Sequence, residues 1–275
     1  MAFVSDVLAI EKQGAVGILW LDRPEKYNAM STELWSSFPA ALDELLGDKE
    51  IGAIVLAGRG KHFCVGIDLV QDSLSDFKKS QSRSQAESNL LQLENTRQFQ
   101  AAITAVADCP VPVIGVIQGF CLGAGVDLIT ACDIRIASAD ALFSVRETRI
   151  GLVADVGTLQ RLPKILNAGH VAELAYTGKD IDALRAEKIG LVNDVYETVE
   201  ATMVAGMALA NQIAANSPMA VRGTKYVLQQ SENLTTDQSL LLNGMYTMIS
   251  SLQSNDLQEG IKAFAERRPA KFTGS

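Results

Sequence analysis

The sequence predicts an α/β protein built around a layer of parallel β-strands, with a helical region at its C-terminal end. Over the first 196 residues, short runs rich in Val and Ile alternate with helical patterns, which is typical of βαβ crossovers. From residue 197 onward, apolar residues instead follow the three- and four-residue spacing of amphipathic helices. We therefore divide the chain into a core, residues 1–196, and a helical region, residues 197–275.

The core begins with two strands and a helix. We expect strands at residues 7–12 and 15–22, separated by Gly14, and then a helix that begins after Ser31, a residue type that caps helix N-termini. Three more apolar runs predict buried strands, at residues 51–58, 111–117 and 134–138.

A polar, Ser-rich stretch interrupts the core at residues 71–97. We expect a mobile loop there, followed by a long surface helix. The apolar residues expected on that helix are Leu90, Leu93, Phe99, Ile103 and Val106.

Four short helices are expected in the C-terminal region. Such short helices rarely pack alone, so we expect them to complete the core or to form a subunit interface. Their ranges are residues 201–215, 219–230, 237–252 and 256–268.

Composition excludes several classes of function. The 275 residues contain 24 Lys and Arg against 32 Asp and Glu, a net charge of −8. Such an acidic chain is not expected to bind nucleic acid, which usually requires a basic face. Only two histidines occur, His62 and His170, which removes most metal sites and histidine-based triads. No apolar run reaches the ~18 residues of a membrane span.

The chain ends and the cysteines predict a soluble, cytoplasmic protein. The first residues show no secretory signal, and the last five, KFTGS, are not a peroxisomal address. Four cysteines without CxxC spacing predict neither a disulfide framework nor a zinc site. We expect most of them to be small buried side chains.

The common phosphate and nucleophile motifs are absent or incomplete. GAGVDL, at residues 123–128, resembles the start of a dinucleotide fingerprint but lacks its third glycine. His62 lies beside Lys61 without an evident acidic or nucleophilic partner, so we predict a loop histidine.

Three carboxylates lie in apolar surroundings where charges are unusual. Asp127 directly follows the glycine turn at residues 123–125, Glu147 ends the run ALFSVRE, and Asp155 lies within IGLVADVG. A helix that begins at this turn presents free N–H groups to an oxyanion. Burial and mutual repulsion raise carboxyl pKa values, which suits proton transfer near neutral pH.

Each carboxylate also has a purely structural interpretation, and the sequence leaves it open. Asp127 would favour the dipole of its helix, and Asp155 would cap a helix that begins at Val156. Glu147 would pair with a nearby arginine, the candidates being Arg146, Arg149 and Arg161.

A second glycine-containing turn, residues 62–69, directly follows the strand expected at residues 51–58. Two turns that offer backbone N–H groups, together with carboxylates, are the parts of a site for a thioester enolate. Such chemistry requires no cofactor.

These residues resemble the crotonase (enoyl-CoA hydratase/isomerase) superfamily over nearly the whole chain. Residues 145–167 are most similar to the Δ3,5-Δ2,4-dienoyl-CoA isomerases of that superfamily. The resemblance implies a ββα spiral core, a C-terminal helical trimerisation region, and a homotrimer or a dimer of trimers. The matching stretches are LDRPEKYNAMSTEL (21–34), IVLAGRGKHFCVGIDL (54–69), PVIGVIQGFCLGAGVDLITACDIRIAS (112–138) and EGIKAFAERRPAKF (259–272).

The resemblance also implies roles for individual residues. Ile67 and Ala124 match the backbone N–H groups of the oxyanion hole, although Ala124 replaces the more usual glycine. Glu147 matches the acid that removes a proton beside the thioester carbonyl, and Asp155 matches the acid that protonates the far end of the dienolate. Asp127 matches a third acid that assists this pair.

Four further positions match family contacts to CoA. Arg23 and Lys26 lie in the early loop, whereas Phe264 and Lys271 lie in the tail that often reaches the CoA of a neighbouring subunit. The expected substrate is an acyl-CoA thioester of unsaturated fatty acid β-oxidation, with no metal, membrane or nucleic-acid partner.

Two other functions remain open at this point. In a 2-enoyl-CoA hydratase, Asp127 and Glu147 would share a water molecule, and Asp155 would only cap a helix. A non-catalytic RNA-binding or scaffolding homologue is the other, which the three acids and the net charge of −8 disfavour.

Overall fold

The computed structural model describes residues 5–69 and 84–275. Its main sheet has six strands in the order β1-β2-β3-β4-β6-β9. The first two strands pair antiparallel, and every later neighbour pairs parallel, so the predicted parallel layer is confirmed. The strands are β1 (Leu8–Gln13), β2 (Val16–Leu21), β3 (Ala53–Gly58), β4 (Val113–Ile117), β6 (Ile134–Ser138) and β9 (Asp194–Tyr196).

A second, smaller sheet lies beside the first and leads into the candidate site. In it β7 pairs parallel with β5 and antiparallel with β8. Its strands are β5 (Phe120–Leu122), β7 (Leu142–Ser144) and β8 (Ile181–Asp182).

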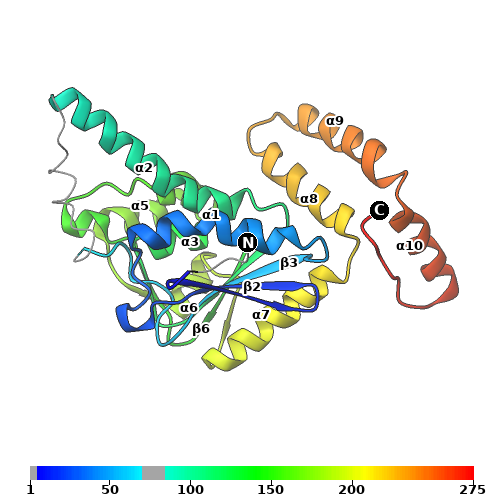
Figure 1. The fold of residues 1–275 in the computed structure, drawn as a ribbon, viewed down its shortest axis with the longest axis horizontal. Helices are drawn as coiled ribbons and strands as arrows, with labels where there is room; N and C mark the ends of the chain where they lie inside the picture. The colour runs from blue at the N-terminus through cyan, green and yellow to red at the C-terminus, as the bar shows by residue number, and fades with distance from the viewer. Residues whose placement is uncertain (1–4, 70–83) are drawn as a thin grey trace.

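Helices cover both faces of the main sheet (Figure 1). On one face, α1, α2 and α3 pack over one large apolar cluster, and on the other face α7 covers a smaller one. Side chains of β2 alternate between the two, Leu19 facing the first and Ile18 the second, as the pleat of a strand requires. These helices are α1 (Thr32–Gly47), α2 (Gln85–Ala107), α3 (Ala124–Ala131) and α7 (Val199–Ala214).

The predicted start of α1 is confirmed. Ser31 is the N-cap, and its hydroxyl accepts a hydrogen bond of 3.3 Å from the N–H of Leu34. One face of the helix, including Phe38 and Leu42, is buried in the large cluster.

The expected long surface helix with Leu90 and Leu93 is confirmed as α2. Ser84 caps this 23-residue helix, which begins at Gln85. The N-terminal half of the helix projects beyond the core, so its polar residues are exposed to solvent (Figure 1). Residues 70–83, where we expected mobility, lie outside the described residues.

The C-terminal helices are confirmed and follow two different arrangements. Whereas α7 packs on the sheet, α8, α9 and α10 lie to one side of the core (Figure 1). A division at residue 196/197 stays a prediction, although α7 joins the core in packing. These three helices are α8 (Pro218–Ser231), α9 (Thr236–Tyr246) and α10 (Asn255–Glu266), with a π-helical turn at Thr247–Ser251.

Short helical elements complete the core. None of the helices in the described ranges is both long and apolar enough to cross a lipid bilayer. The short elements are η1 (Pro24–Lys26), η3 (Glu147–Ile150), α4 (Thr158–Ile165), α5 (Ala168–Thr177) and α6 (Ala183–Ile189).

Candidate active site

Two backbone N–H groups from separate segments lie side by side. Gly123, with φ 52°, turns the chain from β5 into α3, so Ala124 is the first helical residue and its N–H has no acceptor within the helix. Gly66 packs against this turn, because a Cβ built on it would lie 3.7 Å from the Ala124 nitrogen. Ile67 follows Gly66, so the sequence-predicted donors Ile67 and Ala124 come together here.

The N–H of Ile67 is directed away from the neighbouring segment at Met30. Met30 forms hydrogen bonds with the residues on either side of Ile67. Its N–H donates to the carbonyl of Gly66 at 2.8 Å, and its carbonyl accepts from the N–H of Asp68 at 3.1 Å. Since N–H groups alternate in direction along an extended segment, the N–H of Ile67 points to the opposite side.

A cavity of about 540 Å³ borders both donors. Glu147 and Asp155 line it, whereas Asp127 does not. Most of the remaining wall is apolar, as an acyl chain requires. Residues of this apolar wall include Trp35, Val65, Leu69, Phe99, Leu122, Ile150, Leu152, Val153 and Val156.

Glu147 is the first residue of η3, three residues after β7, and lies against the glycine turn. One carboxylate oxygen is 3.3 Å from the position a Cβ would take on Gly123, and the other is buried without a hydrogen-bond partner among the described residues. Burial, and then the charges of Asp127 and Asp155, raise its pKa to about 7. Such a carboxyl can exchange protons near neutral pH.

The arginine partners considered for Glu147 are engaged elsewhere. Arg146 and Arg149 both lie near Asp180, at 2.8 Å and 3.8 Å, and Arg161 donates to the hydroxyl of Thr104 at 3.1 Å. Across residues 5–69 and 84–275, no ion pair holds Glu147.

Asp127 is fully buried behind the cavity. One oxygen accepts a hydrogen bond from the N–H of Thr158, the first residue of α4, and the other has no partner within the described parts of the chain. Burial raises its pKa to about 6. The carboxylate at the start of α4 is therefore Asp127, and the interpretation of Asp155 as that cap is wrong.

Asp155 lies in residues 152–157, which contain no helix or strand. Burial raises its pKa. Its main-chain oxygen accepts a hydrogen bond of 2.6 Å from the side-chain amide of Gln100 on α2. Sequence reasoning missed Gln100, because the bond joins residues 55 positions apart and follows no motif.

The four expected CoA contacts have different surroundings. Arg23 is buried, pairs with Asp68 at 3.1 Å, and donates to the carbonyl of Ala29. This position does not favour the CoA contact expected of Arg23. Lys26 is exposed on η1. Phe264 is 87% exposed on α10, and neither it nor Lys271 lines the cavity of its own chain.

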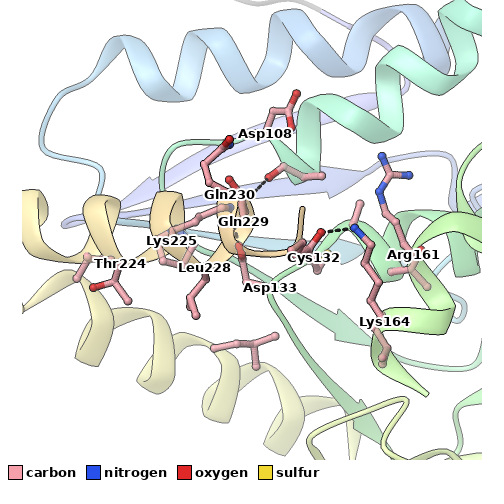
Figure 2. Close-up of a pocket in the computed structure, with 18 of the residues that line it drawn as sticks. Asp108, Cys132, Asp133, Arg161, Lys164, Thr224, Lys225, Leu228, Gln229 and Gln230 are labelled. Atoms are coloured by element: carbon pink, nitrogen blue, oxygen red, sulfur yellow. Dashed lines mark hydrogen bonds and ion pairs between the residues drawn. The ribbon is translucent and has the colours of Figure 1, made fainter. Parts of the chain in front are cut away.

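A larger cavity, of about 960 Å³, lies between α8 and the core. Figure 2 shows Arg161 and Lys164 of α4 on one side of it and Lys225 and Gln229 of α8 on the other. Its lysines are paired internally: Lys225 lies 2.7 Å from Asp133, and Lys164 pairs with Glu232. None of the three acids lines this cavity, whereas Glu147 and Asp155 line the smaller one.

Within residues 5–69 and 84–275, no three His, Cys, Asp or Glu side chains are grouped so that they could hold a metal ion. All four cysteines are buried thiols, as expected for small apolar side chains.

Relatives of known name match most of the chain. The Δ3,5-Δ2,4-dienoyl-CoA isomerase of Dictyostelium discoideum, named as mitochondrial, is 40% identical over 96% of this chain and 90% of its own. A peroxisomal enzyme of the same name from Arabidopsis thaliana is 38% identical over 97% and 96%. These compartments overturn the expectation of a cytoplasmic protein, which rested on the chain ends and the cysteines.

Solved structures and a family comparison agree with these relatives. An enoyl-CoA hydratase from Bacillus anthracis superposes with a TM-score of 0.88 at 27% identity, covering 98% of this chain and all of its own. The sequence model for enoyl-CoA hydratase/isomerase matches residues 11–275. With this fold and two backbone N–H donors beside carboxyl groups in one cavity, the chain belongs to the enoyl-CoA hydratase/isomerase family.

Proposed function

We propose that the protein isomerises 3,5-dienoyl-CoA to 2,4-dienoyl-CoA. The observation that carries this proposal is the placement of the acids. Glu147 and Asp155 share the cavity with the N–H groups of Ile67 and Ala124, and Asp127 is turned toward Thr158 instead. Two acids on one apolar cavity suit a proton shift along an acyl chain. The relatives named as Δ3,5-Δ2,4-dienoyl-CoA isomerases add support.

The reaction needs one proton removed and one delivered. Glu147 takes a proton from C2, and the electrons of that C–H bond move into a dienolate whose oxygen is held by the N–H groups of Ile67 and Ala124. Asp155 then protonates C6, which leaves double bonds at C2 and C4. Glu147 ends protonated and Asp155 ionised, and a proton returned from Glu147 to Asp155 completes the cycle. No electrons are gained or lost overall, so we propose no cofactor.

Asp127 acts on this pair from behind the cavity. Its charge raises the pKa of Glu147, and its bond to Thr158 ties α3 to the start of α4, three residues after Asp155. We propose that Asp127 positions and tunes the two cavity acids without touching substrate.

Hydration of a 2-enoyl-CoA would require a different arrangement. Two carboxyl groups would have to face one water molecule in the cavity. Glu147 meets that requirement, but Asp127 does not line the cavity. Slow hydration by Glu147 and Asp155 is a side reaction that the experiment below measures.

We propose a homotrimer, alone or as a dimer of trimers, in which α8–α10 form the contacts. Large apolar side chains on these helices are exposed, more than a single chain requires. A neighbouring α10 would then bring Phe264 and Lys271 to the CoA, and Lys26 would contact it from the same chain as the cavity. The exposed side chains include Leu240, Leu241, Ile249, Ile261 and Phe264. We place the reaction in the breakdown of unsaturated fatty acids.

The two halves of the reaction can be measured separately. Wild-type protein in D₂O is expected to convert 3,5-dienoyl-CoA to the conjugated product, followed by absorbance, and to exchange the C2 proton, followed by NMR. Asp155→Asn should retain exchange and lose isomerisation, whereas Glu147→Gln should lose both. Full isomerase activity in Asp155→Asn, or hydration of 2-enoyl-CoA faster than isomerisation by the wild type, refutes the proposal.

A further inference from the structure

His62 is buried in an aromatic contact below the candidate oxyanion hole. Its ring stacks on Phe120, with 4.3 Å between centroids and planes 3° apart, and meets Tyr27 edge-on at 5.0 Å. Nδ1 accepts a hydrogen bond of 3.0 Å from the N–H of Phe120. His62 lies in a loop, as predicted, but its ring has specific partners there.

This hydrogen bond completes a short parallel pairing of two segments. Cys64 donates to the carbonyl of Phe120 at 3.0 Å, and Leu122 donates to the carbonyl of Cys64 at 2.9 Å. One more step of the same pattern would join the N–H of Phe120 to the carbonyl of His62. That carbonyl instead accepts the side-chain amide of Asn28 at 2.8 Å, and the imidazole of His62 takes its place.

Gly119 makes room for this substitution. Its φ is 53°, and a Cβ built there would lie 2.5 Å from Nδ1 of His62 and 2.3 Å from the carbonyl of Lys61. Any other residue would displace the ring or the turn.

We infer that His62 is a positioning residue for the oxyanion hole, because its ring fixes the two segments that end in the N–H donors. Ile67 lies three residues beyond Cys64, and Ala124 lies two residues beyond Leu122. The distance between the donors is therefore set by a pairing to which His62 contributes the hydrogen bond to Phe120, next to the bond of 2.8 Å from the N–H of Phe63 to the carbonyl of Gln118. The inference rests on the oxyanion hole of the proposed function, but it does not depend on which reaction the hole serves.

The ring acts in its neutral form. A protonated imidazole would present a donor to the N–H of Phe120. Burial and the charge of Lys61 lower the pKa of His62, and Asp140 opposes them. Lys61, Asp140 and the edge of Tyr27 are the titratable groups that face the ring.

Two substitutions separate the effect of the Nδ1 acceptor from the effect of ring stacking. His62→Asn keeps an oxygen near the position of Nδ1 and loses the stacking, whereas His62→Phe keeps the stacking and loses the acceptor. His62→Phe is expected to lower C2 exchange and isomerisation together by about tenfold, less than the roughly 10²–10³-fold cost of removing a whole donor. His62→Asn should retain most of both rates.

Two further measurements make the test specific. Amide hydrogen exchange of residues 118–124 should be faster in His62→Phe than in the wild type. The control variant His170→Phe, on α5, should change neither this amide exchange nor the rates of C2 exchange and isomerisation. His62→Leu, a smaller side chain without an acceptor, replaces His62→Phe if that variant does not fold.

The outcomes are distinct. Wild-type rates in His62→Phe, or equal losses in His62→Phe and His62→Asn, overturn the inference. If the wild type hydrates 2-enoyl-CoA but does not isomerise dienoyl-CoA, the proposed function fails, and the same variants test His62 on hydration.

Discussion

The side-chain amide of Gln100 donates a hydrogen bond of 2.6 Å to the main-chain oxygen of Asp155. It joins α2 to a segment that has no helix or strand of its own. The position of one of the two cavity acids thus depends on a contact with a distant helix. Glu147, by contrast, begins the short helix η3 and lies next to the glycine turn.

Gln100→Ala is therefore expected to impair only the second half of the reaction. A misplacement of Asp155 by about 1 Å would lower isomerisation by about 10- to 100-fold, while C2 exchange, which needs Glu147 and the oxyanion hole, stays near the wild-type rate. Gln98→Ala, on the exposed side of the same helix, is the matched control. Equal losses of exchange and isomerisation would show that Gln100 supports the whole cavity.

The pH dependence of activity should reflect the raised pKa of Glu147. Because Glu147 must be ionised while Asp155 is protonated, kcat/KM for isomerisation is expected to pass through a maximum as pH rises, with one limb near the Glu147 pKa of about 7. The two limbs belong to the pair of acids rather than to single residues.

Asp155→Asn offers a test of this assignment. In this variant, the rate of C2 exchange should only rise with pH. The rise should occur at lower pH than in the wild type, because the charge of Asp155 no longer raises the pKa of Glu147. If C2 exchange by the wild type is independent of pH between 5.5 and 8 (roughly the range around a pKa of this size), Glu147 is not the base that removes the C2 proton.

The buried carboxyl of Asp127 predicts that stability decreases as pH rises. Its pKa is about 6 in the folded protein against an ordinary 3.8, so the folded state keeps a proton that the unfolded chain has lost. The contribution of Asp127 to the free energy of unfolding should fall from about pH 4 and level off above about pH 6, by a total of about 3 kcal/mol.

Asp127→Asn should reduce this pH dependence, because the side chain keeps an oxygen for the N–H of Thr158 and carries no charge. The share that comes from the raised pKa of Glu147 should remain. Urea denaturation at pH 5 and pH 8, at one protein concentration, measures the effect. Asp43→Asn, an exposed change on α1, should leave the wild-type slope intact. A slope in Asp127→Asn equal to that of the wild type would assign the pH dependence to other groups.

Local signals in the sequence predicted most elements of the fold. The cap at Ser31 and the apolar spacing of α1 are properties of neighbouring residues, so both were visible without coordinates. The exact start of α2 at Gln85 was not visible in the sequence, because the N-terminal half of this helix projects beyond the core and carries no buried apolar face.

The candidate site divides in the same way. Family motifs predicted which residues meet at the cavity, namely Ile67, Ala124, Glu147 and Asp155. They did not predict that Asp127 faces Thr158 instead of the cavity. The contacts of Gln100 and His62 were also missed, since each joins elements that only the folded chain brings together.

Close packing under the oxyanion hole predicts opposite effects for two glycines in helices. Alanine in place of glycine ordinarily stabilises a helix by up to about 1 kcal/mol, and Gly169→Ala on α5 should do so, because a Cβ there has no neighbour within 4 Å. At Gly125 on α3, a Cβ would lie 2.8 Å from the carbonyl oxygen of Cys64. Gly125→Ala should therefore cost about 1–3 kcal/mol and push Ala124 away from Ile67, lowering C2 exchange as well as isomerisation. Thermal unfolding and the exchange assay measure both effects, and a Gly125→Ala variant that is as stable and active as Gly169→Ala would mean that this contact does not hold the two donors together.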